Sequence, residues 1–244
     1  MSTATSPLAA DAVAGVRDAT LRGVLADHWE FTMRWAPTWA TTLGDHRYDD
    51  RLAPRDAAAI AAMDAEHLAL LARIVAIDPV QLDARDAVTC KLMRGKLEAE
   101  QALARCKLHE WVVDSTSGNL FGELSYLVES HIVKSPDDAR NLIARMRQGP
   151  RLIDDTIANL ALGLAAGRMS SAEKVRRVIE QLDAELDEPI ESWAMASPRW
   201  ATRDTPHHRR GARTVPRRRH VPAAARDRAE NRAGAGPPAR PPRR

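Results

Sequence analysis

The sequence predicts an all-α protein: an irregular antiparallel bundle of about seven helices, followed by a disordered basic tail. Three observations lead to this prediction. Apolar residues recur every three or four positions from about Asp18 to Trp193, and no segment shows the alternation of a strand. The breaks in this pattern fall where Pro, Gly, Asp and Ser accumulate. The composition then changes abruptly near Trp200, where the apolar pattern stops.

Two helices are predicted in the first 80 residues. The first carries an apolar and aromatic stripe until Pro37 interrupts it: Leu21, Val24, Leu25, His28, Trp29, Thr32 and Trp35. We expect His28 to lie at the edge of the core. The second runs from about Arg55 to Ile77 and is stopped by Asp78 and Pro79. Its stripe has the same spacing: Ile60, Met63, His67, Leu70, Leu71 and Ile74.

A third helix is predicted to begin at Asp83, with Asp86 in its first turn. Four residues are expected to form its inner face: Val88, Leu92, Ala99 and Leu103. The remaining surface is dense in Lys, Arg and Glu, which indicates a face in contact with water.

Three further helix starts follow, after a helix that ends near Glu129 and His131. Ser135 is an N-cap followed by Pro136 at the first helical position, Gly149-Pro150 begins the next helix, and Ser170-Ser171 caps the last. We expect Gly163 and Gly167 to loosen the end of the middle one. The residues expected to face inward are Leu142, Ile143 and Met146, then Leu152, Ile153, Ile157, Leu160 and Leu164, then Val175, Val178, Ile179, Leu182 and Leu186.

These patterns divide the chain into a flexible N-terminus (1–17), a helical domain (18–198) and a disordered tail rich in Arg and Pro (199–244). From Ala201 onward the chain has 13 Arg, 3 acidic residues and no Lys, Leu, Ile, Phe, Met, Trp or Tyr. Such a segment cannot bury enough apolar surface to offset the entropy lost on ordering.

The tail has two interpretations. Its arginine clusters at 209–210, 217–219 and 243–244 are suited to nonspecific, salt-dependent binding of nucleic acid or an acidic partner. Arg without Lys, mixed with Pro, Ala, Gly and His, is also what GC-rich coding DNA produces when it is read in a wrong frame. We favour the second interpretation, because every lysine and every leucine lies before Trp200.

The cysteines and the hydropathy favour a cytoplasmic protein. Cys90 and Cys106 lie 16 residues apart in one predicted helix, which separates them by about 24 Å and rules out a disulfide between them. We therefore expect reduced thiols. No segment is long and apolar enough to cross a membrane, and the first residues lack the pattern of an export signal.

The residues alone assign no catalytic, cofactor-binding or metal-binding group. The pair His109-Glu110 lacks the second histidine one helical turn away that a zinc peptidase helix has, so we interpret His109 as a surface residue near a helix end. The most polar run is Gly44 to Asp50. We name Asp45, His46 and Arg47 from this run, with Asn119 from a turn-rich loop, as residues that could line a cleft. For the run itself we favour a structural function, in which its Asp and Arg side chains cap the first helices.

The segment Pro37-Thr38-Trp39-Ala40-Thr41-Thr42-Leu43-Gly44-Asp45-His46-Arg47-Tyr48-Asp49-Asp50-Arg51-Leu52 resembles the opening of a large bacterial family, domain of unknown function eight-eight-five. Later segments match the same family in order and spacing: 141–146, 149–154, and 163–167 followed by 175–182. The resemblance extends from about Leu21 to Trp193.

This resemblance implies a helical N-terminal lobe of a metallopeptidase-like hydrolase. Full-length relatives are thought to bind zinc through a His-Glu motif and a later Pro-Gly-His motif, and neither has a counterpart in this chain. We therefore expect a truncated, inactive lobe without a cofactor, whose apolar surface is partly exposed. A peptide substrate is implied for an intact enzyme only, and a separately encoded catalytic half is a candidate partner. The alternative is a helical interaction module that acts through its basic tail.

Overall fold

The computed structural model describes residues 8–114, 120–193 and 196. The chain divides into two units, Met1–Arg203 and Asp204–Arg244, and every described residue belongs to the first. The α-helices are α1 (Ala9–Ala12), α2 (Ala19–Trp35), α3 (Pro37–Leu43), α4 (Ala57–Val75), α5 (Ala84–Ala104), α6 (Leu120–Ser130), α7 (Pro136–Met146), α8 (Gly149–Ala165) and α9 (Ala172–Leu186). Four 3-10 helices join them: η1 (His46–Tyr48), η2 (Pro79–Gln81), η3 (Leu108–Glu110) and η4 (Ile190–Ser192).

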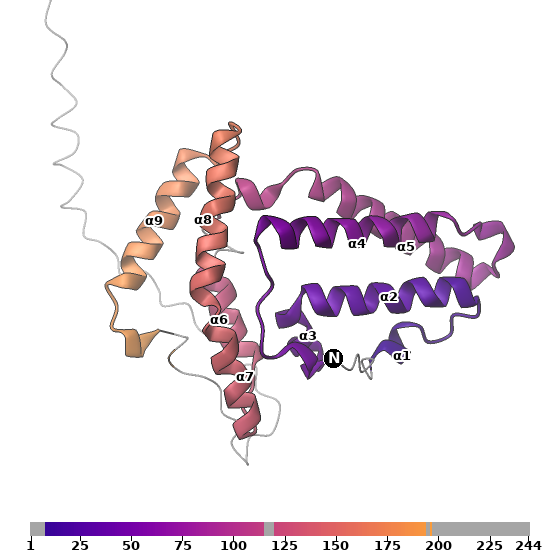
Figure 1. Cartoon of the computed structure of the whole chain (residues 1–244), viewed down its shortest axis with the longest axis horizontal. Helices are drawn as coiled ribbons and strands as arrows, with labels where there is room; N and C mark the ends of the chain where they lie inside the picture. Colours follow the sequence, from indigo (N-terminus) through magenta and orange to yellow (C-terminus); the bar gives the residue numbers. More distant parts are fainter. Residues whose placement is uncertain (1–7, 115–119, 194–195, 197–244) are drawn as a thin grey trace, which may run out of the picture. The chain divides into compact units, whose positions relative to one another are not determined.

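The all-α class is confirmed, because the regular structure in the described residues consists of helices (Figure 1). The seven predicted helices correspond to α2 and to α4 through α9. The two additional helices, α1 and α3, are short, and α3 begins directly at the proline that was expected only to end the preceding helix. The expected tail, 199–244, lies outside the described residues.

Three of the predicted helix starts are confirmed by capping hydrogen bonds, and α8 begins at the predicted Gly149-Pro150 without a side-chain cap. The side chain of Ser135 accepts a hydrogen bond from the backbone N–H of Asp138, with Pro136 at the first helical position. Asp83 and Ser171 cap α5 and α9 in the same way. Each cap satisfies a backbone N–H group that the helix itself cannot pair.

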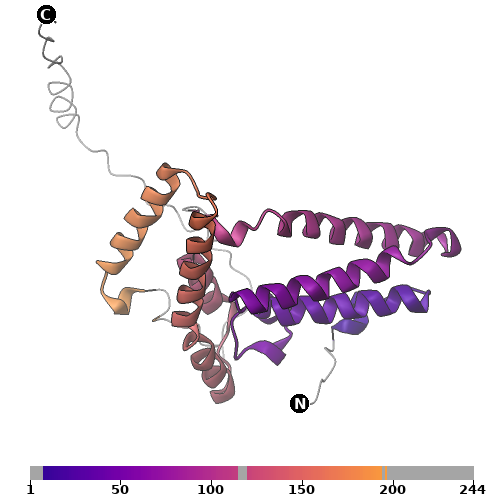
Figure 2. The same cartoon turned by 45° about the horizontal axis from the view of Figure 1, so that its top comes forward.

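Helices α2, α4 and α5 lie side by side and enclose the main apolar core (Figures 1 and 2). The buried residues of this core are Leu21, Val24, Leu25, Leu70, Ile74, Cys90 and Leu97. The stripes predicted for the first two helices therefore face the core. His28 is half-buried and lies 6.4 Å from the ring of Phe31, as expected for a residue at the core edge.

The N-terminal segment 1–17 differs from the flexible segment we expected. Its described part, from residue 8, contains α1, and Val13 and Val16 pack against the main core. A buried carboxylate holds the segment in place: Oδ2 of Asp86 accepts hydrogen bonds from the backbone N–H groups of Arg17 (2.9 Å) and Asp18 (2.7 Å). Asp86 was predicted to favour the helix start, and it also anchors the chain that leads into α2.

The inner face predicted for α5 is wrong. Val88, Leu92 and Leu103 are more than half exposed, and the buried residues of α5 are Asp86, Cys90 and Leu97. Both stripes have helical spacing, and α4 and α2 cover the one that carries Cys90 and Leu97. A second apolar stripe is thus left on the outside. Cys90 is a buried free thiol and Cys106, just beyond the end of α5, is an exposed one.

The inner faces predicted for the last three helices are only partly confirmed. Leu142 and Leu152 are buried, but Ile143, Ile153, Ile157 and Leu164 are exposed. Helix α9 has no buried residue at all, and its Ile179 and Leu186 are more than half exposed. Helical spacing identified the apolar stripes correctly, but within the described residues too few neighbouring helices are present to cover them. None of the described helices combines the length and apolar character that a membrane crossing requires.

Gly163 allows α8 to approach η3 closely, whereas we expected it to loosen the helix end. It is buried within α8, and a Cβ built at this position would clash with the backbone carbonyl of Glu110. The backbone of η3 cannot move away easily, because Ser170 binds the next turn: its Oγ accepts from the N–H of Val113 and donates to the carbonyl of Trp111.

We expect Gly163→Ala to destabilise the protein by about 1–3 kcal/mol, the usual cost of overpacking a close contact. The matched control is Gly95→Ala, because a Cβ at Gly95 meets nothing within 4 Å and alanine favours a helix. Urea denaturation of the parent and both variants gives the change in unfolding free energy that each substitution causes. Equal stabilities would show that η3 does not rest on α8 in solution.

Candidate functional site

The polar run from Gly44 to Asp50 forms a tight turn and η1 directly after α3. Gly44 adopts the left-handed conformation (φ 91°), which ends α3 at little steric cost. The backbone N–H of Asp45 then bonds to the carbonyl of Ala40 at 2.9 Å, and its side chain caps η1 by accepting from the N–H of Arg47. The run is therefore held by its own hydrogen bonds, and the helix that Asp45 caps is η1 within the run.

Asp45 and Arg47 form a two-point ion pair. Nε and Nη2 of Arg47 donate to the two carboxylate oxygens of Asp45 at 2.8 and 2.7 Å, and Nη1 lies 2.9 Å from Glu30 of α2. The hydrogen bond to Asp45 is the main cause of a raised pKa of Arg47. The guanidinium also lies 5.1 Å from the centre of the Tyr48 ring. These contacts join η1 to α2.

Asp49 is the buried acceptor of the site. Its Oδ1 accepts from the hydroxyl of Thr41 at 2.6 Å, and its Oδ2 lies 2.8 Å from Nδ1 of His46. Arg145 of α7 is 3.8 Å away and supplies the opposite charge. Since a buried carboxylate is costly unless it is paired, these three partners account for its position.

Arg145 is completely buried and binds three backbone carbonyls, one at the start of α3 and two in the segment between α3 and α4. Its Nε donates to Arg51 at 2.8 Å, and its Nη2 donates to Tyr48 at 2.7 Å and to Pro37 at 3.2 Å. A further bond reaches the hydroxyl of Thr41 at 2.9 Å. Burial lowers the pKa of Arg145 to about 10, so the side chain is charged at neutral pH. One guanidinium thus holds residues that lie about a hundred positions away in the sequence.

His131 completes the cluster and is held in its neutral form. It is buried, its Nε2 lies 2.9 Å from the carbonyl oxygen of Asp138, and its Nδ1 lies 3.4 Å from Nη1 of Arg145. Because the guanidinium can only donate, Nδ1 accepts and Nε2 carries the proton. Burial is the main cause of a lowered pKa of His131.

Most of the hydrogen-bonding capacity of this cluster serves the fold. Asp45, Arg47 and Arg145 bind groups of the chain itself, whereas the His46 side chain is 62% exposed and is oriented by the buried carboxylate of Asp49. The expectation that Asp45, His46 and Arg47 line a cleft stays a prediction, and Asn119 lies outside the described residues.

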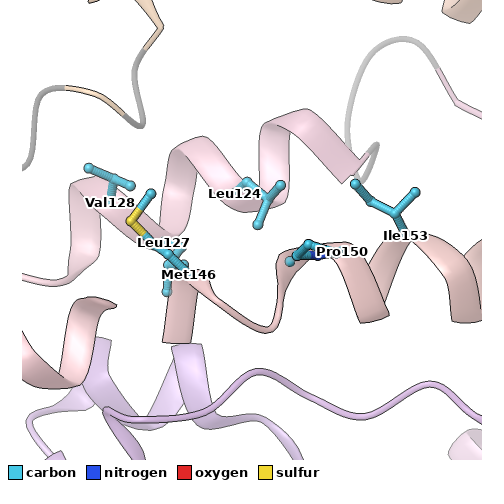
Figure 3. A pocket seen from close by; sticks show the side chains of 7 residues that line it. Leu124, Leu127, Val128, Met146, Pro150 and Ile153 are labelled. Carbon is cyan, nitrogen blue, oxygen red and sulfur yellow. The ribbon is translucent and has the colours of Figure 1, made fainter. Parts of the chain in front are cut away.

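An apolar pocket of about 140 Å³ lies on the other side of α7, where α6 and α8 meet it. Its walls are Leu124, Leu127, Val128, Met146, Gly149, Pro150 and Ile153 (Figure 3). Such a lining offers no group for acid–base chemistry, and it is suited to receiving an apolar side chain. Ile153 also belongs to the exposed stripe of α8, so the pocket and the stripe are continuous.

The pair His109-Glu110 serves the contact between η3 and α8. Glu110 is buried and pairs with Arg168 and with Lys107 (3.1 Å), and its second carboxylate contact is His109 at 3.9 Å. Burial is the main cause of a lowered pKa of His109. Within the described ranges, no three His, Cys, Asp or Glu side chains gather as a metal site.

Sequence reasoning missed the importance of Arg145, Thr41 and His131. The one available signal was position: Arg145 follows the buried Leu142 by three residues, on the same face of α7, where a charged residue is unexpected. Its acceptors are backbone carbonyls, which no sequence pattern marks. The sequence placed His131 only near the end of a helix, whereas the structure shows it almost fully buried, with Arg145 and Asp138 as partners of its two ring nitrogens.

Comparison with protein families gives a match over most of the chain. Residues 37–240 match the family described as "Bacterial protein of unknown function (DUF885)". The chain therefore belongs to this family. The match begins later than the resemblance over Leu21 to Trp193 and also extends further, into the Arg/Pro-rich segment. No curated protein and no solved structure matches the chain.

We expect Arg145→Leu to destabilise the protein by about 3–5 kcal/mol, because it leaves the buried Asp49 without its counter-charge and removes one donor from each of three carbonyls. The control is Arg151→Leu, since Arg151 pairs with Asp56 at the surface and is largely exposed. Denaturant unfolding compares the two. If Arg145→Leu is no less stable than the control, the network does not hold the α3–α4 segment.

His131 predicts a loss of stability at acid pH. Its folded-state pKa lies below the unfolded value of 6.5, so the unfolded chain binds the proton first as the pH falls. The stability that this group contributes is present above about pH 6.5 and is lost as the pH falls through the lowered pKa. We expect His131→Gln to reduce the difference in unfolding free energy between about pH 7.5 and pH 5. If the unfolding free energy of His131→Gln changes with pH as much as that of the parent, other groups cause the change. Candidates are His28 and His109, whose pKa values burial also lowers.

Proposed function

We propose that this chain is the non-catalytic helical lobe of a metallopeptidase-like hydrolase and that it docks a catalytic polypeptide against α8 and α9. The observation that carries the proposal is the exposure of apolar side chains along these two helices. In α8, Ile157 and Leu164 are 60% and 63% exposed, and α9 has no buried residue although its apolar residues recur at helical spacing.

The energetics of these side chains favour a covered state. Burying an isoleucine or leucine side chain contributes about 1.5–3 kcal/mol relative to leaving it in water. Ile153, Ile157 and Leu164 follow one another at intervals of four and seven, which places them along one face of α8. The apolar pocket at Ile153 adds a cavity into which a side chain of the partner fits (Figure 3). The partner is therefore an amphipathic helical segment with at least one large apolar anchor.

Family membership supports the choice of partner. The resemblance to full-length relatives implies a downstream catalytic segment with His-Glu and Pro-Gly-His motifs, and such a segment would supply the zinc ligands and cover a helical lobe. The described residues of this chain offer no group that fits zinc, so we assign no step of the reaction to them. What this chain supplies is a wall for the substrate cleft and an apolar surface that holds the catalytic segment in position.

Reconstitution with the catalytic segment of a full-length relative tests the proposal. We expect the two polypeptides to form a complex on size-exclusion chromatography and to hydrolyse a peptide library in a zinc-dependent manner, whereas this chain alone has no such activity. Ile157→Asp introduces a charge into the docking surface, and it should weaken the complex by at least about tenfold.

The matched control is Val80→Asp, which places the same charge on an exposed apolar residue of η2. Calorimetric titration of both variants with the catalytic segment gives the comparison. Zinc-dependent hydrolysis by this chain alone would contradict the proposal. So would a complex that binds Ile157→Asp as tightly as the parent.

A further inference from the structure

The outward stripe of α5 is a second apolar surface, distinct from α8 and α9. It consists of Val88, Leu92, Gly95 and Ala99, at intervals of four, three and four. This is the spacing of the contact positions in a coiled coil. Val88 and Leu92 are 57% and 70% exposed, and a Cβ at Gly95 would meet nothing within 4 Å. The middle of the stripe therefore has room for a large side chain from outside.

We propose that this stripe pairs with the same stripe of a second copy of the chain, with the two α5 helices antiparallel. The proposal does not depend on the proposed function. In the register we propose, Leu92 of one copy lies opposite Gly95 of the other. Val88 of one copy then lies opposite Ala99 of the other. Each contact thus joins a large residue to a small one, so side chains of one helix enter hollows of the other. Because the pairing has twofold symmetry, every contact occurs twice.

The charges beside the stripe favour the same arrangement. Lys91 and Glu98 lie seven residues apart on one flank of α5, and both are exposed. Glu98 already pairs with Arg94 of its own helix at 2.7 Å. In the antiparallel pair, Lys91 of one copy also lies opposite Glu98 of the other, so two further contacts between opposite charges form. A parallel pair would place like charges at the same level. Charge pairs of this kind specify register and orientation more than they add affinity.

The chain's own C-terminal segment does not fit the stripe. From Ala201 onward it has no Leu, Ile, Phe, Met, Trp or Tyr that could fill the space at Gly95. Its many arginines would meet a surface that already carries Arg94 and Lys96. A contact formed by one helix pair is at the small end of specific interfaces. We therefore expect a reversible equilibrium between monomer and dimer.

Sedimentation velocity over a range of concentrations tests the pairing with the full chain. The parent should shift from monomer to dimer as its concentration rises. Leu92→Glu should raise the dissociation constant at least about tenfold, whereas Leu162→Glu, an exposed leucine on α8, should leave it unchanged. Circular dichroism confirms that each variant keeps its helical content, which is expected because both side chains are exposed.

A charge reversal identifies the second copy as the partner. Lys91→Glu and Glu98→Lys should each weaken the dimer, and the double variant should restore it, because the carboxylate introduced in one copy then faces the ammonium group introduced in the other. No unrelated partner of fixed charge would produce this recovery. The proposal is overturned if the parent stays monomeric, if Leu92→Glu dimerises as well as the parent, or if the double variant remains as weak as the single ones.

Discussion

The buried guanidinium of Arg145 is the interaction on which the arrangement around the candidate site depends. It binds the carbonyls of Pro37, Tyr48 and Arg51, so it holds the start of α3 together with the segment that follows this helix. The carbonyl of Tyr48 also accepts from the backbone N–H of Arg51 at 3.2 Å. A single charged side chain with several donors in one plane binds the three carbonyls together.

Because Arg145 is buried away from water, it requires charged and polar partners close to it. A buried positive charge requires a counter-charge, and the carboxylate of Asp49 lies 3.8 Å away. Asp49 in turn binds Thr41 and orients the exposed His46, while His131 accepts a hydrogen bond from the guanidinium. The most polar run of the sequence is therefore placed by the needs of one buried ion pair, which accounts for its compact, hydrogen-bonded form.

Apolar residues are buried to different extents in the group formed by α2, α4 and α5 and in the pair α8 and α9. Around α2, α4 and α5, three helices enclose one core, and Asp86 fastens the N-terminal segment to it. In α8 and α9, apolar stripes face outward. The outer stripe of α5 is similar in kind but differs in composition, because two large residues, Val88 and Leu92, are followed by two small ones, Gly95 and Ala99. We propose a different partner for each surface: a helix with an apolar anchor for α8 and α9, and a second copy of the chain for α5.

The sequence by itself determined the fold class, the long helices and their caps, because helical periodicity and capping are local properties. Ser135, Asp83 and Ser171 begin their helices as predicted. The DUF885 family was also recognisable from the order of its segments. Tertiary structure alone decided which of two equally periodic stripes of α5 is buried, since that choice depends on where α2 and α4 lie. It also decided the role of Arg145, because its acceptors are backbone carbonyls about a hundred residues away, and a carbonyl looks the same at every position of a sequence.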